Sequence, residues 1–282
     1  MGPVKCKDYG EEVIRSIFQD KEKRIFIADK NGFVRIYAPK GSLIGYLKKN
    51  GNISKTRIPF GANVYSMLQD SHGILWLGTK PNGLFRLKET KDGNFSVKSF
   101  TKNASRYSIN SNSIYAIKED RHGRILLGTF MGGLNIIKNP WSENPKFINS
   151  NNDIGQFPSQ AKCIHDMLLS PSGTLLLATN DGLFTYNIDR NPQKIRFLQN
   201  KRIPSNPKSI SNNEVMALLQ SRNGTIYAAT YGGGLNIIEK GNLHANDLKF
   251  STLTTDNGMM SDVILNMCED AQGMIWLVSE HC

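Results

Sequence analysis

The sequence predicts an all-β fold, a β-propeller of about six four-stranded antiparallel blades, and two observations lead to it. One frame of about fifty residues recurs along the whole 282-residue chain. Each copy of that frame consists of short apolar segments, rich in β-forming residues, that are separated by turns. Four strands in every 40–50 residues are typical of one propeller blade.

The repeat is clearest around one turn position. Residues 64–79 align with residues 114–129, and the same frame recurs at 163–179, 215–230 and 263–279, with a degenerate copy at 13–29. Successive copies are 49 to 51 residues apart, as the turn position shows: Lys23, Gly73, Gly123, Gly173, Gly224 and Gly273.

The second copy illustrates the elements of each unit. Residues 64–69 and 74–78 are predicted strands, and the turn between them holds an aspartate, Asp70, that can accept backbone N–H bonds. A second turn follows Thr79 and leads to a third strand. The fourth predicted strands are 95–100, 146–148, 194–198 and 248–253.

Large and small residues alternate on the second strand of each copy. Trp76 stands three residues after the turn glycine, and Gly78 stands two residues further on. Such a pattern suits the stacking of twisted sheets. We therefore interpret the repeated glycine, tryptophan and aspartate residues as architecture.

Ring closure is open at this stage. The blades start near 13, 64, 114, 163, 215 and 263, and 1–12 is a candidate closing strand, so that 1–282 forms one propeller domain. The last copy shows only two clear strands. The chain is therefore either a six-bladed ring with a lean closing blade or a truncated part of a larger propeller.

The charge balance bears on possible partners. The net charge is +11, from 35 Lys and Arg against 24 Asp and Glu. This charge favours an anionic partner, or it serves solubility. The basic residues are scattered, which argues against direct nucleic-acid binding. No apolar run has the length of a membrane span, and the N-terminus does not resemble a secretory signal.

No catalytic constellation is apparent. The sequence has no G-x-S-x-G, P-loop or H-E-x-x-H motif, and its four cysteines fit no zinc-ligand spacing. The turn aspartates come one per blade, too far apart for paired acid–base work. We therefore predict no catalytic residue, no metal site and no cofactor.

Ligand contacts are expected on one face. The turns between second and third strands and the loops between blades open on the same face, because strand direction alternates. Aromatic rings stack on sugars, and arginine binds carboxylate or sulfate groups. The candidate ligand-binding residues are Lys80, Phe130 and Tyr231 in the turns, and Arg106, Tyr107 and Arg202 in the inter-blade loops.

The repeat resembles a known family. Residues 112–135 and 63–79 resemble the two-component regulator propeller repeat, as do the lead-in segments 108–112 and 209–213. In that family, propellers form the periplasmic sensor half of hybrid two-component proteins of gram-negative gut bacteria. The resemblance implies recognition of oligosaccharides released from glycans and signalling across the membrane to a kinase and a DNA-binding domain.

The chain departs from the usual family pattern. About six blades are present in place of two seven-bladed propellers, and the immunoglobulin-like, membrane, kinase and regulator parts do not occur in this sequence. The resemblance thus implies a periplasmic sensor fragment without enzymatic activity of its own. Its expected partners are a neutral or anionic oligosaccharide and a second propeller, either another copy or a different one. The alternatives are a protein-interaction scaffold and, less favoured, a propeller lyase or hydrolase.

Overall fold

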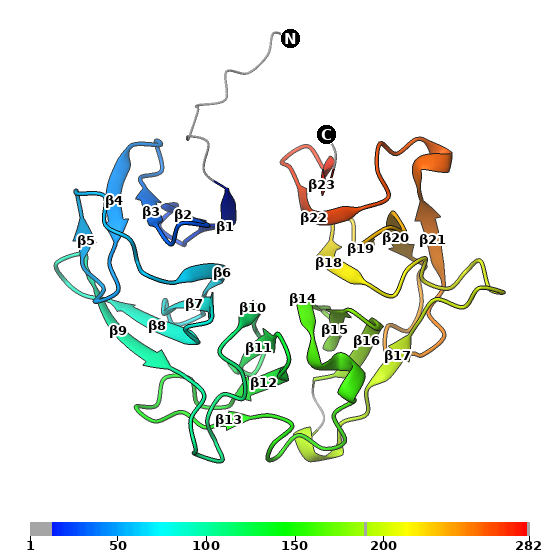
Figure 1. Ribbon diagram of the computed structural model, residues 1–282, viewed down its shortest axis with the longest axis horizontal. Helices are drawn as coiled ribbons and strands as arrows, with labels where there is room; N and C mark the ends of the chain where they lie inside the picture. The colour runs from blue at the N-terminus through cyan, green and yellow to red at the C-terminus, as the bar shows by residue number, and fades with distance from the viewer. Residues whose placement is uncertain (1–12, 189–190, 281–282) are drawn as a thin grey trace, which may run out of the picture. The chain divides into compact units, whose positions relative to one another are not determined.

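The computed structural model describes residues 13–188 and 191–280 of the chain. The chain divides into two compact units, 1–99 and 100–282. In both units, consecutive strands pair antiparallel within a sheet (Figure 1). The predicted all-β fold with antiparallel blades is confirmed. The closing strand expected within 1–12 lies outside the described residues, and the assignment of 1–282 to one domain stays a prediction.

Unit 1 contains two blades within its described residues. Blade 1 has a fifth strand beyond the predicted four, because the chain turns back once more at Gly51. Its strands are β1 (Ile14–Gln19), β2 (Ile25–Asp29), β3 (Val34–Tyr37), β4 (Leu43–Leu47) and β5 (Ile53–Ser54). Blade 2 comprises β6 (Asn63–Gln69), β7 (Leu75–Lys80), β8 (Leu84–Glu89) and β9 (Phe95–Phe100).

Unit 2 contains three four-stranded blades and one two-stranded sheet among its described residues. Blade 3 comprises β10 (Ile114–Glu119), β11 (Ile125–Thr129), β12 (Gly133–Ile137) and β13 (Phe147–Ile148). Blade 4 comprises β14 (Ile164–Leu169), β15 (Thr174–Thr179), β16 (Gly182–Asn187) and β17 (Leu198–Asn200). Blade 5 comprises β18 (Val215–Gln220), β19 (Ile226–Thr230), β20 (Leu235–Ile238) and β21 (Phe250–Leu253). Blade 6 comprises β22 (Ile264–Glu269) and β23 (Ile275–Ser279).

Three short 3₁₀ helices occur in the described loops of unit 2, namely η1 (Ser159–Lys162), η2 (Pro192–Lys194) and η3 (Thr255–Asn257). The helix η2 corrects one prediction, since a strand was expected over 194–198. The side chain of Asn191 accepts a hydrogen bond from the backbone N–H of Gln193 at 3.1 Å, and Pro192 starts the turn. The fourth strand of blade 4 therefore begins only at Leu198.

Blades stack through the faces that the large and small residues define. In unit 1, Phe26 and Ala28 of blade 1 share a buried cluster with Leu75 and Leu77 of blade 2. In unit 2, Leu126 of blade 3 packs in one cluster with Leu175 and Leu177 of blade 4. Blades 4 and 5 form a similar cluster that includes Leu176, Ala178, Ile226 and Ala228. The interpretation of these positions as packing residues is consistent with these clusters.

The turns after the first strands are built on one side chain. Asp70 Oδ1 accepts the backbone N–H groups of His72 and Ile74, each at 2.9 Å, and its Oδ2 accepts Trp76 Nε1–H at 2.9 Å. Gly73 closes this turn at φ 78°, and Lys23 adopts φ 64° at the same position of blade 1. A left-handed residue is required there, so a lysine in this position is strained.

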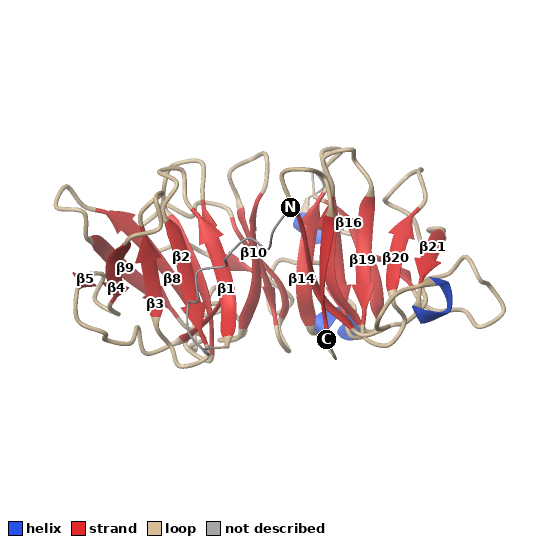
Figure 2. Cartoon of the chain, turned by 90° about the horizontal axis from the view of Figure 1, so that it is seen from above, coloured by secondary structure: helices blue, strands red, loops and turns tan. Residues whose placement is uncertain are grey.

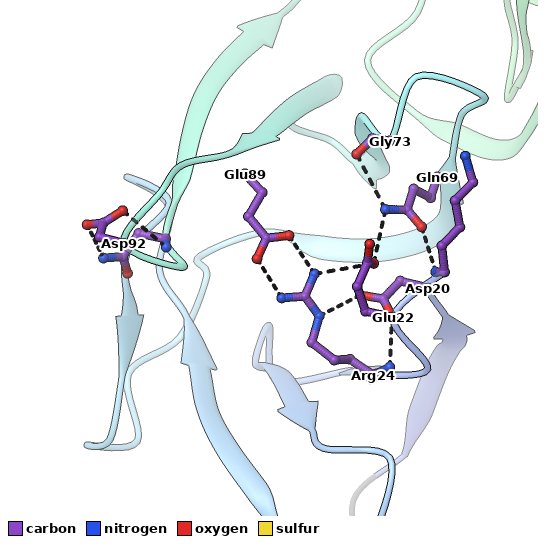
Figure 3. A network of polar contacts seen from close by, with 9 residues as sticks. Asp20, Glu22, Arg24, Gln69, Gly73, Glu89 and Asp92 are labelled. Atoms are coloured by element: carbon purple, nitrogen blue, oxygen red, sulfur yellow. Dashed lines mark hydrogen bonds and ion pairs between the residues drawn. The ribbon is translucent and has the colours of Figure 1, made fainter.

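In blades 1 and 3, an arginine replaces the tryptophan as partner of the turn aspartate. Arg24 Nε donates to Asp20 Oδ2 at 2.6 Å, and its two Nη atoms reach the Glu89 carboxylate of blade 2 at 2.8 and 2.7 Å (Figure 3). Arg124 likewise pairs with Asp120 at 2.5 Å and donates to the Ile188 carbonyl of blade 4 at 2.6 Å. Each arginine thus joins a turn to the following blade.

Candidate functional site

Because consecutive strands pair antiparallel, the turns between second and third strands lie at the same strand ends as the inter-blade loops. Figure 2 shows the strands from the side, with loops at both of their ends. The first residue of such a turn bonds through its backbone to the residue that precedes the first strand. Phe130 N–H donates to the Ser113 carbonyl and Tyr231 N–H to the Glu214 carbonyl, each at 2.9 Å. The repeat therefore holds this residue, which we call the rim residue, at the same place in both blades.

Three of the predicted site residues occupy this rim position. They are Lys80 in unit 1 and Phe130 and Tyr231 in unit 2. Phe130 is 37% exposed and its ring centroid lies 5.8 Å from that of Tyr115. Tyr231 is 39% exposed and donates through its hydroxyl to Glu280 Oε2 at 3.0 Å, which raises the pKa of Tyr231.

Arg106 and Tyr107 lie beside the last strand of blade 3, at the side of the sheet away from its first strand. The Tyr107 carbonyl accepts from Phe147 N–H at 3.0 Å, and Phe147 begins β13, the last strand of blade 3. The Arg106 guanidinium lies 5.6 Å from the centroid of the Tyr107 ring, and Lys146 Nζ lies 4.9 Å from it. Arg106 and Tyr107 are thus brought together with Lys146, while Phe130 follows β11 near the first strand of the blade.

Arg202 lies in the loop after β17 and is exposed. Its backbone N–H donates to Asn213 Oδ1 at 2.8 Å, which closes the loop against the start of blade 5. Its neighbours Lys201 and Ile203, but not Arg202 itself, contribute to the lining of a groove of about 660 Å³.

This cavity, which we call the blade-5 groove, runs between the loop 199–210 and the outer part of blade 5 at 239–250. Its size falls in the range of about 300–1,000 Å³ that is usual for ligand sites. It is lined by Gln199, Asn200, Lys201, Ile203, Asn206, Lys208, Ser209, Ile210, Glu239, Asn246, Asp247, Leu248, Lys249 and Phe250.

Backbone bonds hold the two walls of the blade-5 groove in place. Phe250 N–H donates to the Lys208 carbonyl at 2.9 Å. The side chain of the buried Asn200 accepts from Leu248 N–H and donates to the Ala245 carbonyl, both at 2.9 Å. Because a buried amide ties both walls together, the groove is a preformed feature of the fold.

Charged side chains surround this groove. Lys208 Nζ lies 2.5 Å from Glu239 Oε1, and Lys201 Nζ lies 2.7 Å from Asp181 Oδ1. The hydrogen bond from Lys208 lowers the pKa of Glu239. Lys249 is also exposed at the groove. These lysines can attract an acidic ligand.

The repeat builds a smaller groove at the equivalent place in blade 3. That groove measures about 390 Å³ and is lined by Tyr107, Lys138, Lys146 and Asp153 among others. Tyr107 corresponds to Lys208, since both carbonyls accept the N–H of the phenylalanine that begins the last strand. We call it the blade-3 groove.

Sequence reasoning missed a group of titratable residues on the first strands of unit 2. Asp166, at the β-bulge of β14, accepts Met167 N–H at 2.7 Å and Leu218 N–H of blade 5 at 2.9 Å. Burial raises the pKa of Asp166, and burial lowers the pKa of the adjacent His165. Lys118 acts electrostatically on Asp166, as does Glu214 on His165.

In the sequence, the only sign of this group is that two titratable residues depart from the repeat at the start of a first strand. Every described first strand shifts register within its first four residues, and a bulge redirects the side chains next to it. Repeat alignment shows His165-Asp166 where blade 2 has Tyr65-Ser66. No cluster of three metal-ligating side chains is found in the part of the chain that the structure describes. Among the described helices, none could cross a lipid bilayer by length and apolarity.

Two segments of the sequence match a protein family. Residues 59–80 and 108–131 match the family model described as two component regulator propeller. Both segments span the turn of the frame, in blades 2 and 3. No curated protein matches the chain.

Solved propellers resemble the chain in structure. Virginiamycin B lyase from Staphylococcus aureus, in an inactive form with quinupristin, superimposes with a TM-score of 0.64 at 14% identity, over 95% of this chain and 78% of the lyase. PorZ, a surface component of the type-IX secretion system of Porphyromonas gingivalis, gives a TM-score of 0.69 at 14% identity, over 94% of this chain and 37% of PorZ. At these identities the likeness shows the fold.

A lower similarity is found to an extracellular domain assigned to a hybrid two-component system of B. thetaiotaomicron. The TM-score is 0.46 at 17% identity, over 94% of this chain and 38% of that domain. The chain thus spans less than half the length of PorZ and of this domain. The chain has a β-propeller fold, and residues 59–80 and 108–131 match the two-component regulator propeller repeat, as the sequence frame predicts.

Proposed function

We propose that this chain is part of the extracytoplasmic sensor of a hybrid two-component regulator, where it binds an oligosaccharide without converting it. The observation that carries the proposal is the match of residues 59–80 and 108–131 to the two-component regulator propeller repeat. In this proposal the parent protein lies in the periplasm, is anchored in the membrane and carries a histidine kinase. The propeller supplies the ligand-dependent signal.

The charge and the grooves support a polar, acidic ligand. The chain carries a net charge of +11, which raises the local concentration of anions around it. The grooves of blades 3 and 5 are each lined by lysines and amides. Side chains of this kind bind hydroxyl, carboxylate and sulfate groups.

A binding screen tests the proposal. Thermal unfolding of the chain is measured with neutral and acidic oligosaccharides, and every hit is checked by calorimetry and by chromatography of the sugar after prolonged incubation. We expect saturable binding of at least one acidic oligosaccharide with no product. If no oligosaccharide binds, the sensor proposal is wrong and the interaction scaffold takes its place.

Pairing with a second propeller forms the other part of the proposal. Blade 6 supports it, because Met274, Trp276 and Val278 on β23 and its turn are 63%, 61% and 56% exposed. Apolar residues grouped in this way are typical of contact surfaces. Analytical ultracentrifugation of the wild type and of Trp276→Glu tests this part, and we expect association in the wild type that the variant weakens.

A propeller lyase or hydrolase is the second candidate function. It is favoured by the group of His165, Asp166, Lys118 and Glu214, since perturbed titratable residues are common at catalytic sites. The chromatographic assay separates it from the sensor. Measurable product that disappears in His165→Gln would establish the enzyme and overturn the sensor proposal.

A further inference from the structure

The blade-5 groove is the larger of the two equivalent grooves, and its lining is chemically distinct. It measures about 660 Å³ against about 390 Å³ for the blade-3 groove. Its floor is formed by Ile210 and Phe250, which are 0% and 2% exposed. Ile203 stands at the groove with 50% of its surface exposed, so an apolar contact is available to the C–H face of a sugar.

Three lysines direct charge into this groove. The lining holds Lys201, Lys208 and Lys249 against Glu239 and Asp247, an excess of one positive charge (three minus two), and Lys201 is also paired with Asp181 outside the lining. An ammonium group offers three N–H donors, and the Glu239 carboxylate accepts from Lys208 at 2.5 Å. Lys208 is therefore held in position by Glu239 while it keeps donors for a ligand.

The blade-3 groove lacks this arrangement. Its equivalent of Lys208 is Tyr107, whose ring lies under Lys146 Nζ at 4.9 Å and beside the Arg106 guanidinium at 5.6 Å. Arg106 also reaches Asp153 Oδ1 at 3.5 Å. Arg106 and Lys146 thus face a ring or a carboxylate of the protein, and the groove, which Lys138 also lines, has less room for a ligand.

We propose that the blade-5 groove binds an acidic group of an oligosaccharide, a uronate carboxylate or a sulfate, between Lys208 and Lys249. The sugar ring lies over Ile203, and the amides of Asn206 and Asn246 bind its hydroxyl groups. Glu239 competes with the ligand for Lys208 and sets the affinity. This inference rests on the proposed function and assigns its site and its ligand class.

Calorimetry with trigalacturonate as the acidic probe and maltotriose as the neutral probe of similar size tests the assignment. We expect trigalacturonate to bind more tightly than maltotriose. Its binding should weaken as salt is added, because salt screens the attraction between exposed charges. Lys208→Gln and Lys249→Gln are each expected to lower the affinity for trigalacturonate by roughly three- to tenfold, as for the loss of one partly exposed charge pair.

Matched controls come from neighbouring lysines. Lys240→Gln lies beside the groove but outside its lining, and Lys146→Gln removes the equivalent lysine of the blade-3 groove. Both controls are expected to bind within about twofold of the wild type, since they leave the proposed contacts intact. Equal losses in the controls and in the groove variants would show attraction by the net charge alone and would overturn the site.

A variant that is expected to raise the affinity excludes misfolding as an explanation. Glu239→Gln removes the competitor of the ligand, and its backbone bond to the Lys249 carbonyl at 2.8 Å does not need the carboxylate. We expect this variant to raise the affinity for trigalacturonate by about threefold, which a misfolded protein would not do. Wild-type affinity in Lys208→Gln, Lys249→Gln and Glu239→Gln would reject the groove and leave the sensor function standing. If neither trigalacturonate nor any other oligosaccharide binds, both are rejected.

Discussion

Blades 2 and 6 carry the same turn and bury it to different extents. In blade 2, Trp76 Nε1–H donates to Asp70 Oδ2 at 2.9 Å, and in blade 6 Trp276 Nε1–H donates to Asp270 Oδ2 at 2.7 Å. Trp76 is 0% exposed, whereas Trp276 is 61% exposed. The hydrogen bond therefore forms from residues six positions apart, whether or not other parts of the protein cover the indole.

The comparison separates two contributions to stability. The turn bonds are local, so the repeat frame alone builds them. The burial of the ring depends on contacts that the frame does not supply. The same aspartate and tryptophan should therefore affect stability strongly in blade 2 and weakly in blade 6.

The largest difference is expected for the tryptophans. Trp76→Ala should lower the free energy of unfolding by about 3–5 kcal/mol, because it leaves a cavity in a buried site. Trp276→Ala should lower it by only about 1 kcal/mol, since most of its ring is already in contact with water. Urea unfolding followed by far-UV circular dichroism measures both. Equal losses would contradict the role given to burial.

Replacing the turn aspartate should also cost more stability in blade 2 than in blade 6, with a smaller difference than for the tryptophans. Asp70→Ala leaves the buried Trp76 Nε1–H and two backbone N–H groups without their acceptor, which should cost about 1–3 kcal/mol. Asp270→Ala should cost less, because water can replace the carboxylate at this exposed turn. The same unfolding experiment compares the two, and a larger loss in blade 6 would break the comparison.

Acid should reduce the stability that Asp270 contributes to the blade-6 turn. The hydrogen bond from Trp276 lowers the pKa of Asp270, so the folded state binds its proton less readily than the unfolded chain does. The stability that Asp270 contributes is present above the unfolded pKa of about 3.9 and is lost as the pH falls through the folded pKa. The stability difference between wild type and Asp270→Asn should thus shrink below pH 4, and a difference that grows on acidification would refute this reading.

The smallest effect concerns the turn position itself. Lys23 holds φ 64° where blade 2 has Gly73 at φ 78°. Lys23→Gly should relieve the left-handed strain and raise the free energy of unfolding by about 0.5–1 kcal/mol, partly offset by the greater freedom of the unfolded chain. Gly73→Lys should instead lower the free energy of unfolding. Thermal unfolding of both variants beside the wild type measures the two effects.

Most of the fold was predictable because the frame repeats. The spacing of the turn residues located the strands, and 95–100 coincides with β9. Residues 194–198 were misassigned because Asn191 and Pro192 start a 3₁₀ turn, a local preference that the repeat average conceals. The fifth strand of blade 1 was missed because the other repeats have four strands at most.

The candidate site was less predictable. The rim position of Phe130 and Tyr231 follows from the turn and can be found by alignment. The blade-5 groove brings Lys208 beside Glu239 and Lys249, residues that are 31 and 41 positions away in the chain. Arg202 and Lys208 look alike in sequence, and only the loop geometry makes Lys208 the one that lines the groove. Asp166 was overlooked because a lone acid on a strand carries no motif.

By itself, the sequence determined the first three strands of the regular repeats, the aspartate turns and the left-handed residue that closes each of them, since these depend on residues close together in the chain. The tertiary structure alone decided which tryptophan is buried, which lysines face a cavity and which carboxylate is desolvated. Those properties depend on residues that are distant in the sequence, and short-range residue preferences contain no information about such contacts.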